Sequence, residues 1–177
     1  MSSSFIFVLA LILMVGCTST ETSSSSADLI SQNDFESLDG WLPVPSSVTM
    51  ERAHSGHYAT KIDVSVEYGL GYASTLAKAG LVAGQDIEVS AWALRTGAEA
   101  NGAIVVQVFD AIDGQQVYWQ ALQIGEQVKT YNRWMLIKKR FQLPKNALAN
   151  HQLRVYPWRN QASQPAYFDD IRLLRVR

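Results

Sequence analysis

The chain has 177 residues and a formal net charge of −1, and 47% of its residues are hydrophobic while 18% are charged. This size and composition suit one globular domain with a real core. The near-neutral balance argues against a nucleic-acid partner, because such binding normally needs a strong basic excess. The charge is uneven, however: residues 1–128 carry 4 Lys and Arg against 14 Asp and Glu, and residues 129–177 carry 11 against 2. We expect these parts to pair across the strands of one fold; a basic surface patch is the alternative.

The N-terminus begins with an unbroken apolar run, residues 5–15, followed by Gly16 and Cys17. The run is shorter than the ~20 residues of a membrane-spanning helix and has the length of a signal-peptide apolar region. A small residue before a cysteine resembles the bacterial lipoprotein signal, which implies that residues 1–16 are removed and that Cys17 is lipidated. Met14 and the lack of an early Lys or Arg depart from that pattern. An ordinary secretory signal with an incidental cysteine is the alternative.

Residues 17–27 are rich in Ser and Thr and have no apolar periodicity. We interpret them as a flexible tether after the lipidated cysteine. The membrane contact expected from the sequence is therefore through the lipid anchor alone. Thr18 is not the Asp that resembles an inner-membrane retention signal, so an outer-membrane location is favoured. Cys17 is the only cysteine, which excludes an internal disulfide.

From residue 28 to residue 177 we expect one all-β domain, because apolar residues recur with a period of two between frequent Gly, Pro, Asn and Asp. The predicted strands are 28–36, 47–52, 58–66, 70–76, 86–95, 103–110, 116–123, 132–142, 151–157 and 166–175. Asp113-Gly114 gives the clearest hairpin turn. About ten short strands with this spacing predict an antiparallel β-sandwich, most plausibly a jelly roll.

Five spaced motifs support one family resemblance. They are Asn33-Asp34-Phe35-Glu36 with Trp41, then residues 53–59 around Ser55-Gly56, then residues 87–93 around Trp92, then Trp134 with residues 141–144, and finally Tyr167-Phe168-Asp169-Asp170-Ile171. In this order they resemble the galactose-binding-like jelly-roll superfamily, and within it the carbohydrate-binding modules of xylanases and glucanases. The resemblance covers residues 28–176.

The resemblance implies a structural Ca²⁺ that joins the first and last strands. Its implied ligands are Glu36, backbone oxygens near Ser55 to His57, and Asp169 or Asp170. Alternation with Ile171 points Asp169 inward, where a carboxylate needs a partner, and Ca²⁺ is bound by oxygens. The alternative is that Glu36 and Asp169 face water or pair with arginines.

A glycan-binding face would carry flat aromatic side chains, because the apolar faces of sugar rings stack on them. We expect the ligand-binding side chains to be Gln107, Trp119, Arg154, Tyr156 and Trp158, with Tyr72 as a further candidate. Tyr118 and Trp119 are adjacent, so only one of them can lie on the outer surface. Tyr72 and Tyr68 flank a Gly-rich run that is either a ligand-facing strand or a bulge.

No catalytic constellation stands out. Asp169 and Asp170 are adjacent on a strand, so their side chains diverge, and His54-Ser-Gly-His57 lacks the context of a zinc site or a triad. We therefore expect a non-enzymatic, lipid-anchored module of the cell envelope that binds a polysaccharide or oligosaccharide. A structural or adhesion module that binds another envelope protein is the alternative.

Overall fold

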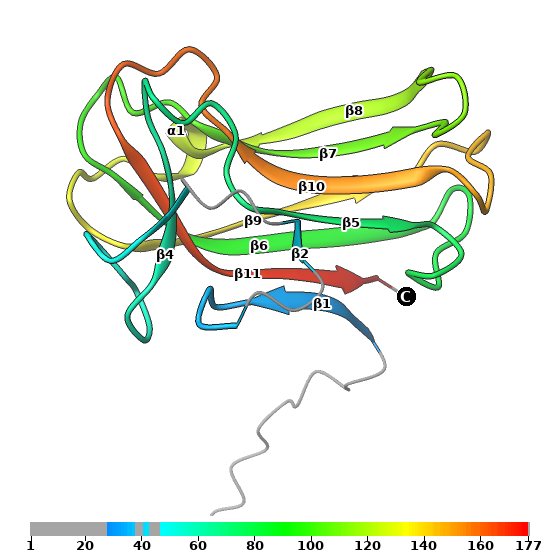
Figure 1. Ribbon diagram of the computed structural model, residues 1–177, viewed down its shortest axis with the longest axis horizontal. Helices are drawn as coiled ribbons and strands as arrows, with labels where there is room; N and C mark the ends of the chain where they lie inside the picture. The colour runs from blue at the N-terminus through cyan, green and yellow to red at the C-terminus, as the bar shows by residue number, and fades with distance from the viewer. Residues whose placement is uncertain (1–27, 38–40, 43–46, 177) are drawn as a thin grey trace, which may run out of the picture.

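Two antiparallel β-sheets pack face to face in the computed structural model, which describes residues 28–37, 41–42 and 47–176 (Figure 1). The first sheet has the order β3 (Val48–Thr49), β4 (Ala59–Ile62), β11 (Ala166–Arg175), β6 (Asp86–Arg95), β9 (Met135–Gln142), and β1 (Leu29–Asn33) also pairs with β11. The second sheet has the order β2 (Trp41–Leu42), β5 (Gly71–Thr75), β10 (Gln152–Trp158), β7 (Ala103–Phe109), β8 (Gln116–Gln123). The predicted sandwich is confirmed.

One short helix, α1 (Ile124–Gln127), follows β8. Within the described ranges no helix has the length and apolar character needed to cross a bilayer. The long predicted strands agree closely with β6, β7, β8, β9, β10 and β11. The prediction missed β2, which has two residues, and made β3 and β4 too long. The chain leaves β4 at Asp63, where the carboxylate accepts the backbone N–H of Ser65 at 2.8 Å and forms a turn.

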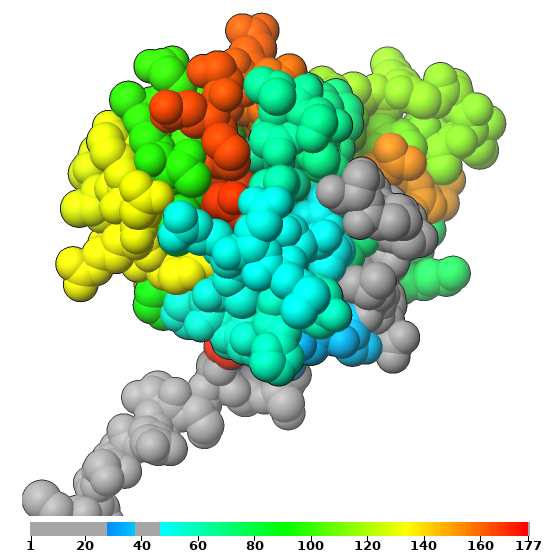
Figure 2. Space-filling model, turned by 60° about the vertical axis from the view of Figure 1, so that its left-hand side comes forward, coloured from blue at the N-terminus to red at the C-terminus, as the bar shows by residue number. Residues whose placement is uncertain are grey.

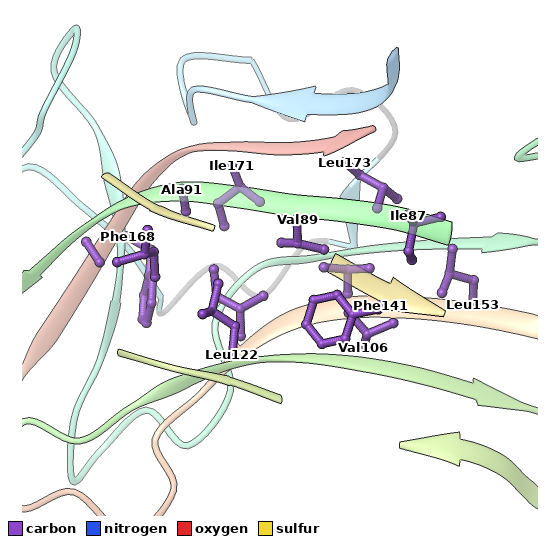
Figure 3. Close-up of a cluster of buried hydrophobic side chains, with 14 of the residues drawn as sticks. Ile87, Val89, Ala91, Val106, Leu122, Phe141, Leu153, Phe168, Ile171 and Leu173 are labelled. Atoms are coloured by element: carbon purple, nitrogen blue, oxygen red, sulfur yellow. The ribbon is translucent and has the colours of Figure 1, made fainter. Parts of the chain in front are cut away.

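The core lies between the sheets and follows from alternation along each strand. In β6 the side chains of Ile87, Val89 and Ala91 are fully buried, and the residues between them are only partly buried. They meet side chains from the second sheet, including Val106 and Leu153, in one continuous cluster (Figure 3). A one-residue shift in register would turn these side chains outward, so the core fixes the register of both sheets.

The hairpin between β7 and β8 turns at the predicted Asp113-Gly114 pair, where Gly114 has φ +74°. A cross-strand ion pair also joins the acidic and basic parts of the chain: Arg140 of β9 lies 3.4 Å from Glu88 of β6. This contact agrees with the expectation that the two parts pair across strands.

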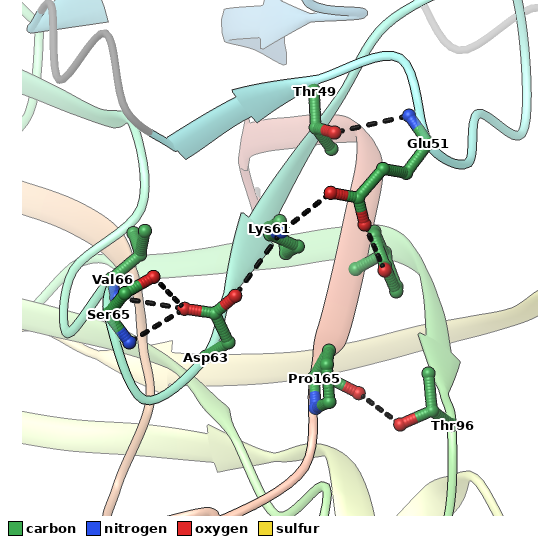
Figure 4. Close-up of polar contacts among 9 residues, drawn as sticks. Thr49, Glu51, Lys61, Asp63, Ser65, Val66, Thr96 and Pro165 are labelled. Carbon is green, nitrogen blue, oxygen red and sulfur yellow. Dashed lines mark hydrogen bonds and ion pairs between the residues drawn. The ribbon is translucent and has the colours of Figure 1, made fainter.

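Polar side chains tie the loop after β3 to β4 and β11 at one end of the first sheet (Figure 4). Lys61 lies 2.7 Å from Glu51 and 3.2 Å from Asp63, and the hydroxyl of Tyr167 donates to Glu51 at 2.7 Å. Burial, together with the hydrogen bond to Glu51, raises the pKa of Tyr167 to about 12. The hydroxyl therefore remains a donor throughout the neutral pH range.

Lys61 is expected to stabilise the fold most strongly between acidic and alkaline extremes. Its hydrogen bond lowers the pKa of Glu51 below 4.5, and the same bond raises the pKa of Lys61 above 10.5. Burial alone would raise the pKa of Asp63, but hydrogen bonds from Ser65 and Lys61 outweigh it and hold that pKa below 3.8. Lowered carboxyl pKa values give stability that is lost as the pH falls, and a raised lysine pKa gives stability that is lost as the pH rises.

The substitution Lys61→Met tests this predicted dependence of stability on pH. Urea unfolding of both proteins should show the largest stability difference near pH 7 and a smaller one below about pH 4 or above about pH 11. A difference that is constant across this range would contradict the assignment.

Candidate functional site

The outer face of the second sheet carries aromatic side chains above a floor of small residues. Ala103 and Val105 of β7 and Ala121 of β8 are buried on this side, and Tyr156 and Trp158 of β10 pack over them. The strand registers account for this: Val105 lies opposite Tyr156 and Ala103 lies opposite Trp158. Small residues at these positions let the large rings lie along the sheet.

Four aromatic rings on this face form two edge-to-face pairs. The rings of Trp119 and Trp158 have their centroids 5.8 Å apart, and so do those of Tyr68 and Tyr156. This geometry is favourable for aromatic pairs and restricts ring rotation. Trp119 is 39% exposed and Tyr68 is 52% exposed, so both present ring surface to solvent. We call these four residues the aromatic face.

A carboxylate fixes the orientation of Trp158. The indole Nε1 of Trp158 donates to Glu67 Oε1 at 2.8 Å, and Arg159 Nε donates to Glu67 Oε2 at 2.6 Å. The backbone N–H of Arg159 also donates to the carbonyl of Glu67 at 2.9 Å. The segment that holds Glu67 and Tyr68 is thereby attached to the end of β10, which brings Tyr68 onto the aromatic face.

A pocket of about 330 Å³ lies beside Tyr156. It is lined by Tyr68, Gly69, Gly71, Tyr72, Gln107, Arg154 and Tyr156. A Cβ at Gly71 would lie 2.6 Å from the Cβ of Tyr156, and one at Gly69 would lie 2.9 Å from the Cβ of Pro157. The two glycines are therefore required for the close approach of this segment to β10, and they leave the floor of the pocket open.

Polar groups surround the rings. Gln107 lies opposite both Arg154 and Trp119 in the strand registers. The hydroxyl of Tyr156 donates to Gln107 Oε1 at 3.5 Å, and the guanidinium of Arg154 lies 4.5 Å from the centroid of the Phe109 ring. Burial raises the pKa of Tyr156, with a hydrogen bond from Trp119 acting in the opposite direction. The Tyr156 hydroxyl is thus neutral and can donate this hydrogen bond to Gln107.

The structure brings five of the six predicted ligand-binding side chains onto one surface: Gln107, Trp119, Arg154, Tyr156 and Trp158. The prediction that only one of Tyr118 and Trp119 is external is confirmed, because Tyr118 packs against the core. Tyr72 differs from the other candidates. It lines the pocket but lies opposite Val155 and packs partly against the core, so it is placed at the pocket wall and not among the exposed rings.

Sequence reasoning did not select Glu67 or Tyr68 as site residues. The sequence places Tyr68 at one end of the Gly-rich run but does not determine on which side of the sheet its ring lies. The backbone bridge between Tyr68 and Trp158 places the two side chains on the same side of the sheet. Nothing in the sequence around Glu67 indicates a role in the site, because its two hydrogen-bond partners are 91 and 92 residues away in the chain.

Asp169 connects the last strand, β11, to the loop after β3. We call the contacts of Asp169, Asp170 and Glu36 with residues 54–58 the joint. It is 0% exposed, and its Oδ2 accepts the backbone N–H groups of His54 at 2.7 Å and Ser55 at 3.1 Å. Burial raises the pKa of Asp169, although the backbone hydrogen bonds act in the opposite direction. Asp170 sits at a bulge with φ +48° and accepts from Ser55 Oγ at 2.9 Å. The expected divergence of the two side chains is therefore wrong: the bulge lets both carboxylates contact His54 and Ser55.

Glu36 accepts backbone N–H groups in the same region. Its Oε1 lies 2.7 Å from the nitrogens of both His57 and Tyr58, and these bonds lower its pKa. Gly56 has φ +56°, and a Cβ there would lie 2.5 Å from the Glu36 carboxyl group. The turn thus closes on the carboxylate only because residue 56 is glycine.

The predicted calcium ligands meet in this joint, but their carboxylates do not converge on a common centre. Asp169, Asp170 and Glu36 each accept hydrogen bonds from residues 54–58, and the described residues contain no group of three or more His, Cys, Asp and Glu side chains suited to a metal ion. In this arrangement amide, hydroxyl and imidazole groups already contact the carboxylates. Calcium binding stays a prediction.

The outer face of the first sheet also carries aromatic residues. His54 stacks on Trp92 with ring centroids 3.9 Å apart and meets the edge of Trp134 at 5.9 Å, while its Nδ1 lies 2.7 Å from Asp170 Oδ2. These contacts pack Trp92 and Trp134 against the loop that follows β3. The side chain of Trp41 and the lipidation residue Cys17 lie outside the described residues.

Several solved structures with a similar fold are carbohydrate-binding modules. The chain aligns with the C-terminal family 22 carbohydrate-binding module of Clostridium thermocellum Xyn10B at 16% identity and a TM-score of 0.59, covering 85% of this chain and 94% of that one. For the CBM22-1 xylan-binding domain of Paenibacillus barcinonensis Xyn10C the values are 17%, 0.55, 85% and 96%. Identities this low support a shared fold but do not assign roles to individual residues.

A third match is the CBM22-1 and GH10 modules of Clostridium thermocellum xylanase 10B, which were crystallised with xylohexaose. Its identity is 16% and its TM-score 0.56, and the alignment covers 85% of this chain but spans 29% of that longer protein. No family model matches the sequence, and no curated protein matches it.

Proposed function

We propose that the protein binds a polysaccharide chain, without cleaving it, on the outer face of β5, β10, β7 and β8. The observation that carries this proposal is the aromatic face, which combines exposed rings of Trp119 and Tyr68 with the pocket beside Tyr156. Rings of this kind bury the apolar faces of pyranose sugars. Because the face is open and runs along the strands, it suits several consecutive sugar units.

The polar side chains suit sugar hydroxyl groups. Arg154 supplies donors, and Gln107 supplies both donors and acceptors. No outward-facing position of the four strands holds an Asp or Glu in the part of the chain that the structure describes. A neutral glycan matches this mixture better than a strongly charged ligand does.

The similarity of fold to xylan-binding modules makes xylan the first glycan to test. The lack of paired acids on the outward positions supports a non-catalytic role, since glycoside hydrolysis commonly uses two carboxyl groups about 5–9 Å apart. Glu67 borders the aromatic face, but Trp158 and Arg159 hold both of its oxygens.

Membrane attachment is the second part of the proposal. It is supported by the apolar run at residues 5–15 and by Gly16-Cys17, all of which lie outside the described residues. A lipidated Cys17 would hold the domain at a cell-envelope membrane, which we propose to be the outer membrane. Mass spectrometry of the protein purified from its native membrane should then find acyl chains on Cys17 and no residues before it.

Affinity electrophoresis against xylan, β-glucan, mannan and galactan tests the binding function. We expect at least one polysaccharide to retard the protein, and soluble oligosaccharides of that glycan to reverse the retardation. If no glycan retards it and an envelope protein is captured instead, the adhesion module that we considered as the alternative is correct.

Calcium binding is tested by thermal unfolding. If the joint takes up Ca²⁺, calcium should raise the melting temperature over a chelated sample, because an ion that binds the folded state alone stabilises it by mass action. Glu36→Gln should remove that increase. Equal melting temperatures with calcium and with chelator would indicate that the carboxylates hold backbone N–H groups instead.

A further inference from the structure

Four exposed aliphatic side chains gather at one end of the sandwich. Val82 is 66% exposed in the loop between β5 and β6, Ile112 is 87% exposed in the loop between β7 and β8, and Leu148 is 57% exposed in the loop between β9 and β10. Leu29, at the start of β1, is 40% exposed. Figure 1 shows these three loops, the start of β1 and the end of β11 on its right-hand side.

Contacts between the loops make this end one surface. The N–H of Ala77 donates to the carbonyl of Ala149 at 2.9 Å, which joins the first loop to the third. The side chains of His151 and Asp110 approach to 3.9 Å, which joins the third loop to the hairpin. We call this surface, with Val82, Ile112 and Leu148 at its loop tips, the loop end.

Single exposed aliphatic residues are common on soluble proteins, but several on neighbouring loop tips indicate a contact surface. The charges in these loops are balanced, with Lys78 and Lys145 against Asp110 and Asp113. The loop end therefore has no strong field that would select a charged partner. What it offers to a partner is apolar.

The place where the described chain begins indicates what the loop end contacts. The described chain begins at Asp28, next to Leu29 at the loop end, and Cys17 lies 11 residues earlier. Eleven residues span at most about 36–40 Å. A membrane that holds Cys17 or the apolar run before it is therefore within reach of the loop end.

We propose that the loop end rests on a lipid bilayer, with Val82, Ile112 and Leu148 entering the boundary between headgroups and acyl chains. This inference rests on the membrane attachment proposed above and is independent of glycan binding. Three aliphatic side chains bury little surface and would bind weakly in isolation. A covalently held domain needs only weak contacts, because attachment gives it a high effective concentration at the membrane.

Contact at the loop end would orient the aromatic face. β10 begins at Gln152, beside the loop end, and ends at Trp158 near the opposite end of the sandwich. Figure 2 shows that opposite end, where the chain from β3 to the loop after β4 lies at the centre of the view. The bilayer would thus leave Trp158 and Tyr68 at the end of the sandwich farther from the membrane, open to a polysaccharide.

Coupling through Cys17 tests the proposal without depending on natural lipidation. The chain from Cys17 onward retains every described residue, and its single cysteine can be joined to maleimide lipids in phosphatidylcholine vesicles. Hydrogen exchange should slow several-fold in loops 77–85, 110–115 and 143–151, compared with the same protein coupled to a soluble maleimide polymer. A triple variant, Val82→Ser, Ile112→Ser and Leu148→Ser, should lose this protection.

The matched control changes three equally exposed aliphatic residues elsewhere: Met50→Ser (68% exposed), Val64→Ser (73%) and Leu136→Ser (55%). This variant should keep the protection of the loop end. Equal exchange on vesicles and on the soluble polymer would overturn the proposal, and so would protection of another face. Because the vesicles contain neither protein nor glycan, failure here leaves the electrophoresis result unaffected.

Discussion

Trp158→Ala is expected to weaken binding of the preferred oligosaccharide by about 30-fold or more, which corresponds to about 2 kcal/mol. Trp158 packs against Trp119 and is fixed by Glu67, so its ring is held ready for stacking before a ligand arrives. Trp119→Ala should have a similar effect with little change in melting temperature, because Trp119 is already 39% exposed. Isothermal titration calorimetry measures the affinity of each variant.

Trp134→Ala is the matched control, because this tryptophan is also partly buried but packs against His54 outside the aromatic face. It should bind the oligosaccharide like the natural protein. If Trp158→Ala and Trp119→Ala both bind normally, the ligand lies on another surface.

Asp169→Ala is expected to cost about 3 kcal/mol of unfolding free energy, because it removes a buried carboxylate and leaves the part-buried N–H groups of His54 and Ser55 without their acceptor. These bonds connect the last strand to the loop after β3, so their loss should loosen both. Urea unfolding in the presence of a chelator gives the value without any contribution from calcium.

Asp170→Asn serves as the control for this change. Asp170 is partly exposed, and asparagine tolerates the positive φ at this position. We expect a cost below about 1 kcal/mol, as is usual for exposed polar pairs. Equal losses for the two variants would mean that Asp169 has no special role in the joint.

The fold was predictable because its signals are local. Alternation marks Ile87, Val89 and Ala91 as one buried row, and Asp113-Gly114 marks the hairpin that the structure confirms. Each of these features depends on residues within a few positions of one another. Asp169 is buried as expected, but not on the core face that alternation with Ile171 predicts. It lies opposite Trp92 under the loop of His54, because a bulge in β11 breaks the alternation.

The remaining features depend on contacts between distant segments. Glu67 becomes a site residue only because β10 ends beside it, and the two-residue strand β2 exists only as a partner of β5. The sequence groups Tyr72 with the outer residues, but its register with Val155 packs its ring partly against the core, at the wall of the pocket. The backbone N–H groups that bind Asp169 are 114 and 115 residues away in the chain. The sequence therefore suggests that a buried Asp169 has a partner, but it does not identify that partner.

Mapping of amide chemical shifts during titration with the best-binding oligosaccharide tests the central claim most directly, because it reports which face the ligand covers. We predict that the largest changes fall on β5, β7, β8 and β10 and on the indole N–H groups of Trp119 and Trp158. Changes centred on β6, β9 and β11, or no changes at saturating oligosaccharide, would contradict a glycan site on the aromatic face.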